Sequence, residues 1–201
     1  AYATGLSTGI NTVSGVAGSA NIEITPSAIM PAGLTARVLI APEAGGSGSA
    51  DKGSSGAGGT GGGYDVTLEA GSELLGVDGL TIYAGMSSID KDTAVSTQDD
   101  GVDEETIGIK YAMGGFTVGY QVSKEDLGTN SGAMQYDNTG YGITFNVNDD
   151  LSVGYNNYES DQTNSGGNVT TEAASFQVAY TMGGMSIKAY NMETTNPGYD
   201  S

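Results

Sequence analysis

Apolar and polar side chains alternate along most of the second half of the chain. In the segment 105–113, Ile107, Ile109 and Tyr111 occupy odd positions, and the even positions beside them are small or polar. The same alternation recurs in 116–124, 136–147, 151–159 and 173–182. A period of two predicts β-strands with one apolar and one polar face.

Very short turns join these strands in pairs. Gly114–Gly115 and Gly183–Gly184 are two such turns, 146–151 is a third between them, and 76–79 is a weaker one. Successive turns lie about 35 residues apart. Longer polar stretches separate the pairs, at 43–63, 89–104, 125–135 and 160–172. Short turns on one side and long loops on the other are typical of an outer-membrane barrel.

The whole pattern predicts an all-β chain with about ten strands, most of them long enough to cross a bilayer at a tilt. The expected strands are 20–25, 34–42, 64–70, 79–88, 105–113, 116–124, 136–147, 151–159, 173–182 and 185–193. We expect one antiparallel up-and-down transmembrane β-barrel domain over 1–201, with loop-like ends at 1–19 and 194–201.

A soluble β-sandwich would alternate in the same way, so the choice depends on the two faces. The polar face is rich in Gly, Ser, Thr, Asn and Gln, which suits a water-filled lumen better than a soluble surface. Tyr111 and Tyr180 stand at equivalent places before their turns, as in an interfacial aromatic girdle. Both observations favour the membrane barrel.

Composition narrows the range of possible functions. The 201 residues include 24 Asp and Glu against 6 Lys and Arg, a net charge of −18, which argues against nucleic acid as a partner. The chain has no Cys and no His, so a Ser-His-Asp or Cys-His arrangement and an imidazole metal site are excluded. We expect no enzyme and no cofactor, although the acidic loops could hold Ca²⁺ or Mg²⁺ loosely and bridge to lipopolysaccharide.

Two hairpins carry a family resemblance. The segments 105–120 and 176–190 resemble hairpins of Gram-negative general-diffusion porins, in the style of marine alphaproteobacteria, and the likeness extends over 64–193. It implies a 16-stranded barrel, usually a trimer, with an inward-folded loop that narrows the pore. The chain has fewer strands, and its last residues, Gly198 to Ser201, do not end in an aromatic residue. We therefore expect a fragment of a longer barrel.

The resemblance implies passive diffusion of small hydrophilic solutes and ions through the bacterial outer membrane. The implied partners are outer-membrane lipid, lipopolysaccharide and two further copies of the chain. One alternative is a secreted or surface adhesive β-protein, since Gly- and Asn-rich repeats suit that role as well. A second alternative is a barrel without a pore function that serves as a lipid anchor or an assembly scaffold.

Strand parity selects the candidate pore residues. Lys110 and Lys188 lie on the polar face at equal distances from their Gly-Gly turns, and Arg37 joins them if Val38 and Ile40 face lipid. The complete predicted set is Arg37, Lys110, Gln121, Asn146, Gln177 and Lys188.

The acidic segment 89–104 could fold toward these basic residues. Its carboxylates are Asp90, Asp92, Asp99, Asp100, Asp103 and Glu104. An acidic loop opposite a basic wall would create a transverse field across the pore. In the alternative, the lysines are ordinary wetted residues and the loop lies outside. Excess carboxylate at the pore mouth predicts a preference for cations.

Overall fold

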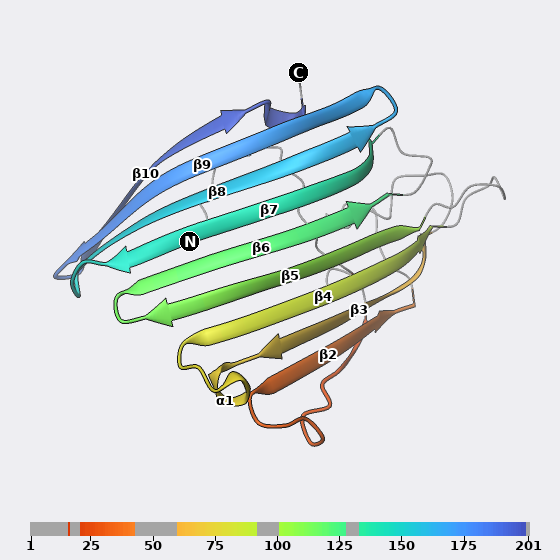
Figure 1. The fold of residues 1–201 in the computed structure, drawn as a ribbon, viewed down its shortest axis with the longest axis horizontal. Coiled ribbons are helices and arrows are strands. Elements are labelled where there is room, and N and C mark those ends of the chain that lie inside the picture. Colours follow the sequence, from red (N-terminus) through yellow and green to blue (C-terminus); the bar gives the residue numbers. More distant parts are fainter. Residues whose placement is uncertain (1–15, 17–20, 43–59, 92–100, 128–132, 200–201) are drawn as a thin grey trace.

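The computed structural model of the chain describes residue 16 and residues 21–42, 60–91, 101–127 and 133–199. Within them, ten strands form one antiparallel sheet in which each strand pairs with its neighbours in sequence (Figure 1). The strands are β1 Ile22–Ile24, β2 Leu34–Ala41, β3 Thr60–Ala70, β4 Leu80–Lys91, β5 Val102–Met113, β6 Phe116–Asp126, β7 Ala133–Asn146, β8 Leu151–Asn164, β9 Gly167–Met182 and β10 Met185–Thr195. The predicted all-β, up-and-down architecture is confirmed.

At the short-turn side the strands end where the alternation predicts. β5 stops at Met113 and β6 starts at Phe116, and β9 and β10 flank the second Gly-Gly pair in the same way. Gly114 and Gly183, the first residues of these pairs, both have φ of 58°. A left-handed first position is the requirement of a type II′ hairpin turn, which matches the twist of the flanking strands.

At the opposite side the strands run further than predicted. The expected loop 160–172 is instead a tight connection between Asn164 and Gly167, because β8 and β9 continue as a paired ladder through most of it. In this region both faces of the strands are polar, so the apolar alternation that marks a strand disappears. The backbone ladder needs no apolar side chain and continues without it.

Two short helices interrupt the strand pattern. Helix α1, Ser72–Leu75, lies in the connection between β3 and β4, and the 3-10 helix η1, Pro197–Tyr199, follows β10. The predicted loop-like end therefore begins later than residue 194 among the described residues. No helix in the described part of the chain is long and apolar enough to span a membrane.

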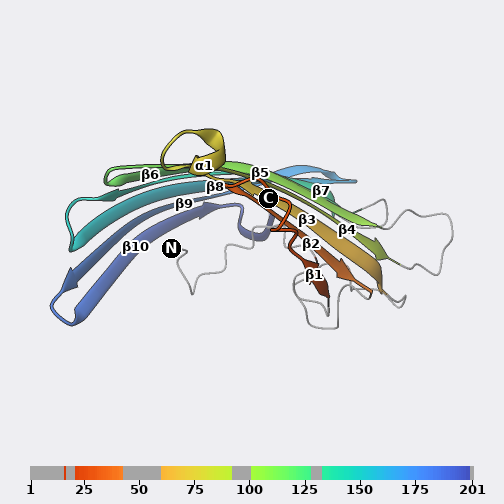
Figure 2. The ribbon, with the colours of Figure 1, turned by 90° about the horizontal axis from the view of Figure 1, so that it is seen from below.

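The sheet bends into an arch with a concave and a convex side (Figure 2). Side chains crowd together on the concave side of a bent sheet and are therefore less exposed there. The face with the more buried side chains is thus the concave face. Nine of the ten buried polar residues in the described part of the chain share one face by register: Asp65, Ser87, Glu104, Ser123, Glu125, Asn138, Ser160, Thr171 and Ser175. We call this the concave face, and the opposite face the convex face.

The convex face carries a band of exposed apolar side chains next to the short turns. Along β5 it contains Met113, Ile109 and Ile107, and then changes to Glu105 and Asp103. β4 and β6 to β10 change after a similar number of residues. The charged residues beyond the band are Asp90, Asp103, Glu105, Lys124, Asp126, Asp137, Glu159, Asp161, Glu172 and Glu193. Seven or eight tilted strand residues span roughly 20 Å, close to the apolar height of outer-membrane barrels.

One part of the concave face is apolar. Leu39, Ala41, Ile89 and Val102 form a small buried cluster near the loop end of β2, β4 and β5, and Val16 packs on it. The backbone N–H of Val16 donates to both carboxylate oxygens of Asp65, each at 3.0 Å. Val16 is therefore anchored inside the arch.

Candidate pore-lining face

All six predicted pore-lining residues lie on the concave face. Cross-strand pairing connects them: Asn146 pairs with Ser152, Ser152 with Ala179, and Ala179 with Lys188. The same register places Arg37, Lys110, Gln121 and Gln177 on this side of β2, β5, β6 and β9. Paired residues of neighbouring strands project from the same side of a sheet, so these six share one surface. Their role in a pore stays a prediction.

Three cations occupy equivalent places on this surface. Arg37, Lys110 and Lys188 are each the fourth residue from the short-turn end of their strands, and all three are exposed. If the short turns lie at one depth, these side chains form a basic layer at one height.

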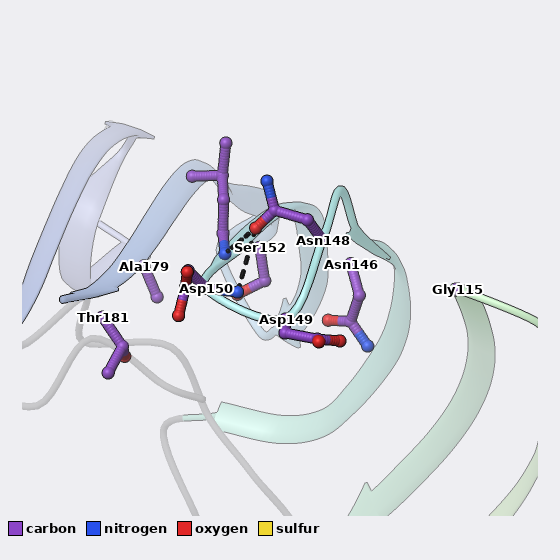
Figure 3. Close-up of a pocket in the computed structure, with 9 residues that line it drawn as sticks. Gly115, Asn146, Asn148, Asp149, Asp150, Ser152, Ala179 and Thr181 are labelled. Carbon is purple, nitrogen blue, oxygen red and sulfur yellow. Dashed lines mark hydrogen bonds between the residues drawn. The ribbon is translucent and has the colours of Figure 1, made fainter. Parts of the chain in front are cut away.

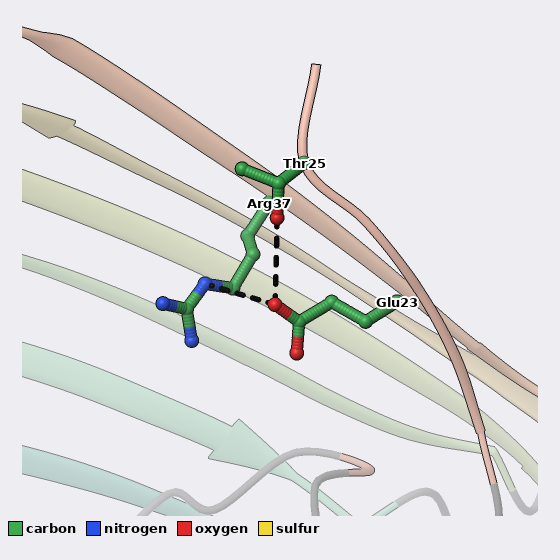
Figure 4. Close-up of polar contacts among 3 residues, drawn as sticks. All are labelled: Glu23, Thr25 and Arg37. Atoms are coloured by element: carbon green, nitrogen blue, oxygen red, sulfur yellow. Dashed lines mark hydrogen bonds and ion pairs between the residues drawn. The ribbon is translucent and has the colours of Figure 1, made fainter. Parts of the chain in front are cut away.

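Arg37 has a partner that the sequence pattern missed. Its Nε lies 3.5 Å from Oε1 of Glu23 on β1, which also accepts a hydrogen bond from Thr25 Oγ1 at 3.4 Å (Figure 4). The Arg37 and Glu23 side chains are 54% and 47% exposed, and ion pairs of this kind contribute only about 0–1 kcal/mol. The sequence does contain a signal for the side on which Glu23 lies, because the apolar residues Ile22 and Ile24 alternate with it.

The acidic segment does not form the single loop that we expected. Asp90 lies in β4, and Asp103 and Glu104 lie in β5, because β4 continues past Ile89 and β5 already begins at Val102, before the regular apolar alternation starts. Asp90 and Asp103 project from the convex face, away from the lysines, and only Glu104 faces inward. The remaining members, Asp92, Asp99 and Asp100, lie outside the described residues.

A row of carboxylates that the sequence pattern missed crosses the concave face toward the loop end. Asp65 pairs with Ser87, Ser87 with Glu104, and Glu104 with Glu125, and all four residues are buried. The sequence pattern did not predict the position of Glu125 on this face, because Glu125 falls in a predicted loop. It did not predict that of Asp65, because Asp65 follows a glycine-rich stretch. In the described residues, no group of three or more potential ligands is placed to hold a metal ion.

The concave face therefore has its charges in two layers. The cations lie near the short turns, and the buried carboxylates Asp65, Glu104 and Glu125 lie nearer the loop end. Two exposed carboxylates lie closer to the cations: Glu23, which pairs with Arg37, and Glu69, one residue from the short-turn end of β3. On β5, Lys110 and Glu104 are six residues apart, which is about 20 Å along an extended strand. The field between these layers runs along the strands rather than across the arch.

Between the layers, on β6 to β9, the surface is neutral and hydrogen-bonded. Gln177 Nε2 donates to Asn156 Oδ1 at 3.0 Å and to Ser175 Oγ at 3.2 Å. Asn138 Nδ2 donates to Ser123 Oγ at 3.3 Å. Amides and hydroxyls of this kind interact well with water, as the lining of an aqueous channel requires.

A shallow open hollow of about 540 Å³ lies at the short-turn end (Figure 3). Asn148 organises its rim, because its Oδ1 accepts the backbone N–H groups of Asp150 and Leu151, each at 2.9 Å. The residues around the hollow are Gly115, Asn146, Asn148, Asp149, Asp150, Leu151, Ser152, Ala179 and Thr181. The hollow is polar and open, so it suits an entrance better than a closed binding pocket.

No protein-family model and no curated protein sequence matches the chain. Solved structures do match it. An outer membrane protein of Vibrio cholerae, OmpT folded in vitro, aligns with a TM-score of 0.63 at 13% identity, over 90% of this chain and 57% of its own. OmpF of Salmonella typhi, in a complex with daunomycin, aligns with a TM-score of 0.63 at 12% identity, over 84% of this chain and 52% of its own.

OmpT of Vibrio cholerae expressed in the outer membrane gives a TM-score of 0.60 at 12% identity, over 90% of this chain and 57% of its own. The chain thus spans a little over half the length of these proteins. At such identities the likeness concerns the fold, which is that of outer-membrane β-barrels, as predicted. The 16 strands and the trimer implied by the porin resemblance stay predictions.

Proposed function

We propose that the chain forms part of a porin of the bacterial outer membrane, which allows small hydrophilic solutes and ions to diffuse passively and prefers cations. One observation carries the proposal. The convex face is apolar where a bilayer would contact it, while the concave face of the same strands is polar and holds exposed Arg37, Lys110 and Lys188. A charged residue in mid-membrane is tolerated where it faces water.

The preference for cations rests on the balance of charge. Glu23, Asp65, Glu69, Glu104 and Glu125 share the concave face with the three cations, and the chain carries 24 acidic against 6 basic residues. A negative interior raises the local concentration of cations and lowers that of anions. We expect no catalysis and no resident cofactor.

The test is the reversal potential, in a KCl gradient, of single channels formed by the whole protein that contains this chain. We expect a value on the cation-selective side. Lys110→Glu should shift it further in that direction, because this side chain is exposed on the concave face. Folding should be unchanged, since the new carboxylate stays in water.

Lys124→Glu is the matched control. It makes the same change of charge on β6, but Lys124 projects from the convex face beyond the apolar band. Clear anion selectivity, or equal shifts in the two variants, would contradict the proposal. A protein that stays soluble without detergent and gives no conductance would support the secreted adhesive alternative instead.

A further inference from the structure

Five residues of five consecutive strands form one straight row across the concave face. Tyr83 of β4 pairs with Gly108, Gly108 with Gln121, Gln121 with Gly140, and Gly140 with Tyr158 of β8. We call this the tyrosine row. It has a glutamine at its centre, a glycine on each side and a tyrosine at each end.

Both tyrosine rings lie across the neighbouring glycine. A Cβ atom on Gly108 would be 2.3 Å from Cζ and 2.4 Å from the hydroxyl oxygen of Tyr83. A Cβ on Gly140 would be 2.8 Å from Cδ2 of Tyr158. Any side chain at either glycine would occupy the place of the ring, so the two rings lie against the wall from opposite sides of Gln121.

Gln121 is held with its donors available. Tyr83 donates its hydroxyl hydrogen to Gln121 Oε1 at 2.9 Å, which fixes the amide plane. The Nε2 group keeps two N–H donors. Beside it on the same strand and face is Gly119, where an added Cβ would meet only Ile109 O, at 3.8 Å. The amide therefore borders a place where the wall carries no side chain.

The chemistry of the row suits one class of solute. An aromatic ring has an electron-rich face, and a sugar ring presents C–H groups with partial positive charge on one of its faces. The N–H groups of Gln121 can donate to sugar hydroxyls. The row itself contains no charged residue, and on its loop side it borders Thr106, Ser123 and Asn138, which are neutral. Its charged neighbours are Glu69, which pairs with Tyr83 at one end of the row, and Lys110, two residues from Gly108 on the same face of β5.

We propose that the tyrosine row is a binding site for a neutral oligosaccharide, with the rings of Tyr83 and Tyr158 as stacking surfaces and Gln121 as the central donor. The rings rest over β5 and β7, two strand spacings or about 10 Å apart, a span that a short oligosaccharide can bridge and a monosaccharide cannot. The site adds a solute class to the proposed porin function. It rests on that function only because the solute must reach the concave face.

The test is a titration of the whole protein that contains this chain, solubilised in detergent, with maltotriose, and saturation-transfer NMR detects the binding. Maltotriose should bind more tightly than glucose or the acyclic polyol sorbitol. Tyr158→Leu keeps apolar cover over Gly140 but removes the aromatic face, and it should weaken binding about three- to tenfold, the worth of one aromatic contact. Gln121→Ala should weaken binding by a similar factor.

Tyr190→Ala is the matched control, because Tyr190 is also on the concave face but exposed, at the edge strand β10. It should leave maltotriose affinity unchanged. If the rings only cover the glycines, Tyr158→Leu and Gln121→Ala will bind maltotriose as the unmodified chain does, and the proposal is overturned. Equal affinity for sorbitol also overturns it.

The same sugar added to a bilayer separates this site from the proposed function. Maltotriose should reduce the KCl current of the channel formed by the whole protein that contains this chain, and reduce it less in Tyr158→Leu. Binding in detergent without any conductance would reject the porin and keep the site. Conductance without binding would reject the site and keep the porin.

Discussion

Gly79 shows how a single residue can fix a strand junction. It precedes β4 with φ of 76°, and a Cβ there would lie 1.9 Å from the carbonyl oxygen of Ala112 on β5. The carbonyl oxygen of Gly79 also accepts the backbone N–H of Ala112 at 2.9 Å. A side chain at this position would therefore break the contact that aligns the two strands.

Gly79→Ala should destabilise the sheet by about 2 kcal/mol or more, because it combines backbone strain with a collision against backbone atoms. Gly76→Ala is the matched control, since Gly76 has φ of 69° but no atom within 4 Å of an added Cβ. It should cost about 1 kcal/mol, the strain alone. Denaturant unfolding in detergent measures both, and equal losses would contradict the steric argument.

Within each of the strands β4 to β10, the convex face changes from apolar to charged at a similar depth. On β5 the change lies between Ile107 and Glu105, and on β6 between Val122 and Lys124. The backbone pairing continues across the change without a break. The strand is therefore longer than the part of it that a bilayer can cover.

Ile109→Lys and Asp103→Lys test this boundary on one strand and one face. Ile109 lies inside the apolar band, so lysine there should cost about 2–4 kcal/mol in a lipid bilayer. Asp103 lies beyond the band, and lysine there should cost about 0–1 kcal/mol. Unfolding in lipid vesicles measures the difference, and similar costs at both positions would show that lipid does not cover this face.

At the scale of the whole molecule, the described sheet is open. The strand order runs from β1 to β10, and in the described residues no strand pairs with the outer edge of β10. A free edge leaves every second backbone N–H and C=O group of an 11-residue strand without a strand partner. In lipid such an edge is costly, so the arch needs further strands to become a barrel.

Hydrogen exchange of the chain in detergent micelles should show this edge. Amide hydrogens of β10 that bond to β9 should exchange slowly, and those that point away should exchange fast, in alternation along the strand. Uniform protection along β10 would show that another strand, such as one from a second copy, is bound there. The amides of β6, which has partners on both sides, supply the reference.

The sequence pattern predicts the strands, the short-turn ends and the face of every candidate pore residue. Those features depend on alternation and on glycine, which are local. The long ends of β8 and β9 could not be predicted, because backbone pairing without apolar side chains leaves no pattern. The buried row from Asp65 to Glu125 and the covering of Gly108 by Tyr83 also escaped, since both depend on the register between strands.

The simple strand order also has a consequence for how the protein folds. Each strand pairs only with strands beside it in the chain, so a hairpin can form before the strands that follow it are in place. The contact between Val16 and Asp65 is different, because it joins residues 49 positions apart and needs β3 in place first. Assembly can thus proceed by adding hairpins at one growing edge, and Val16 docks onto a wall that already exists.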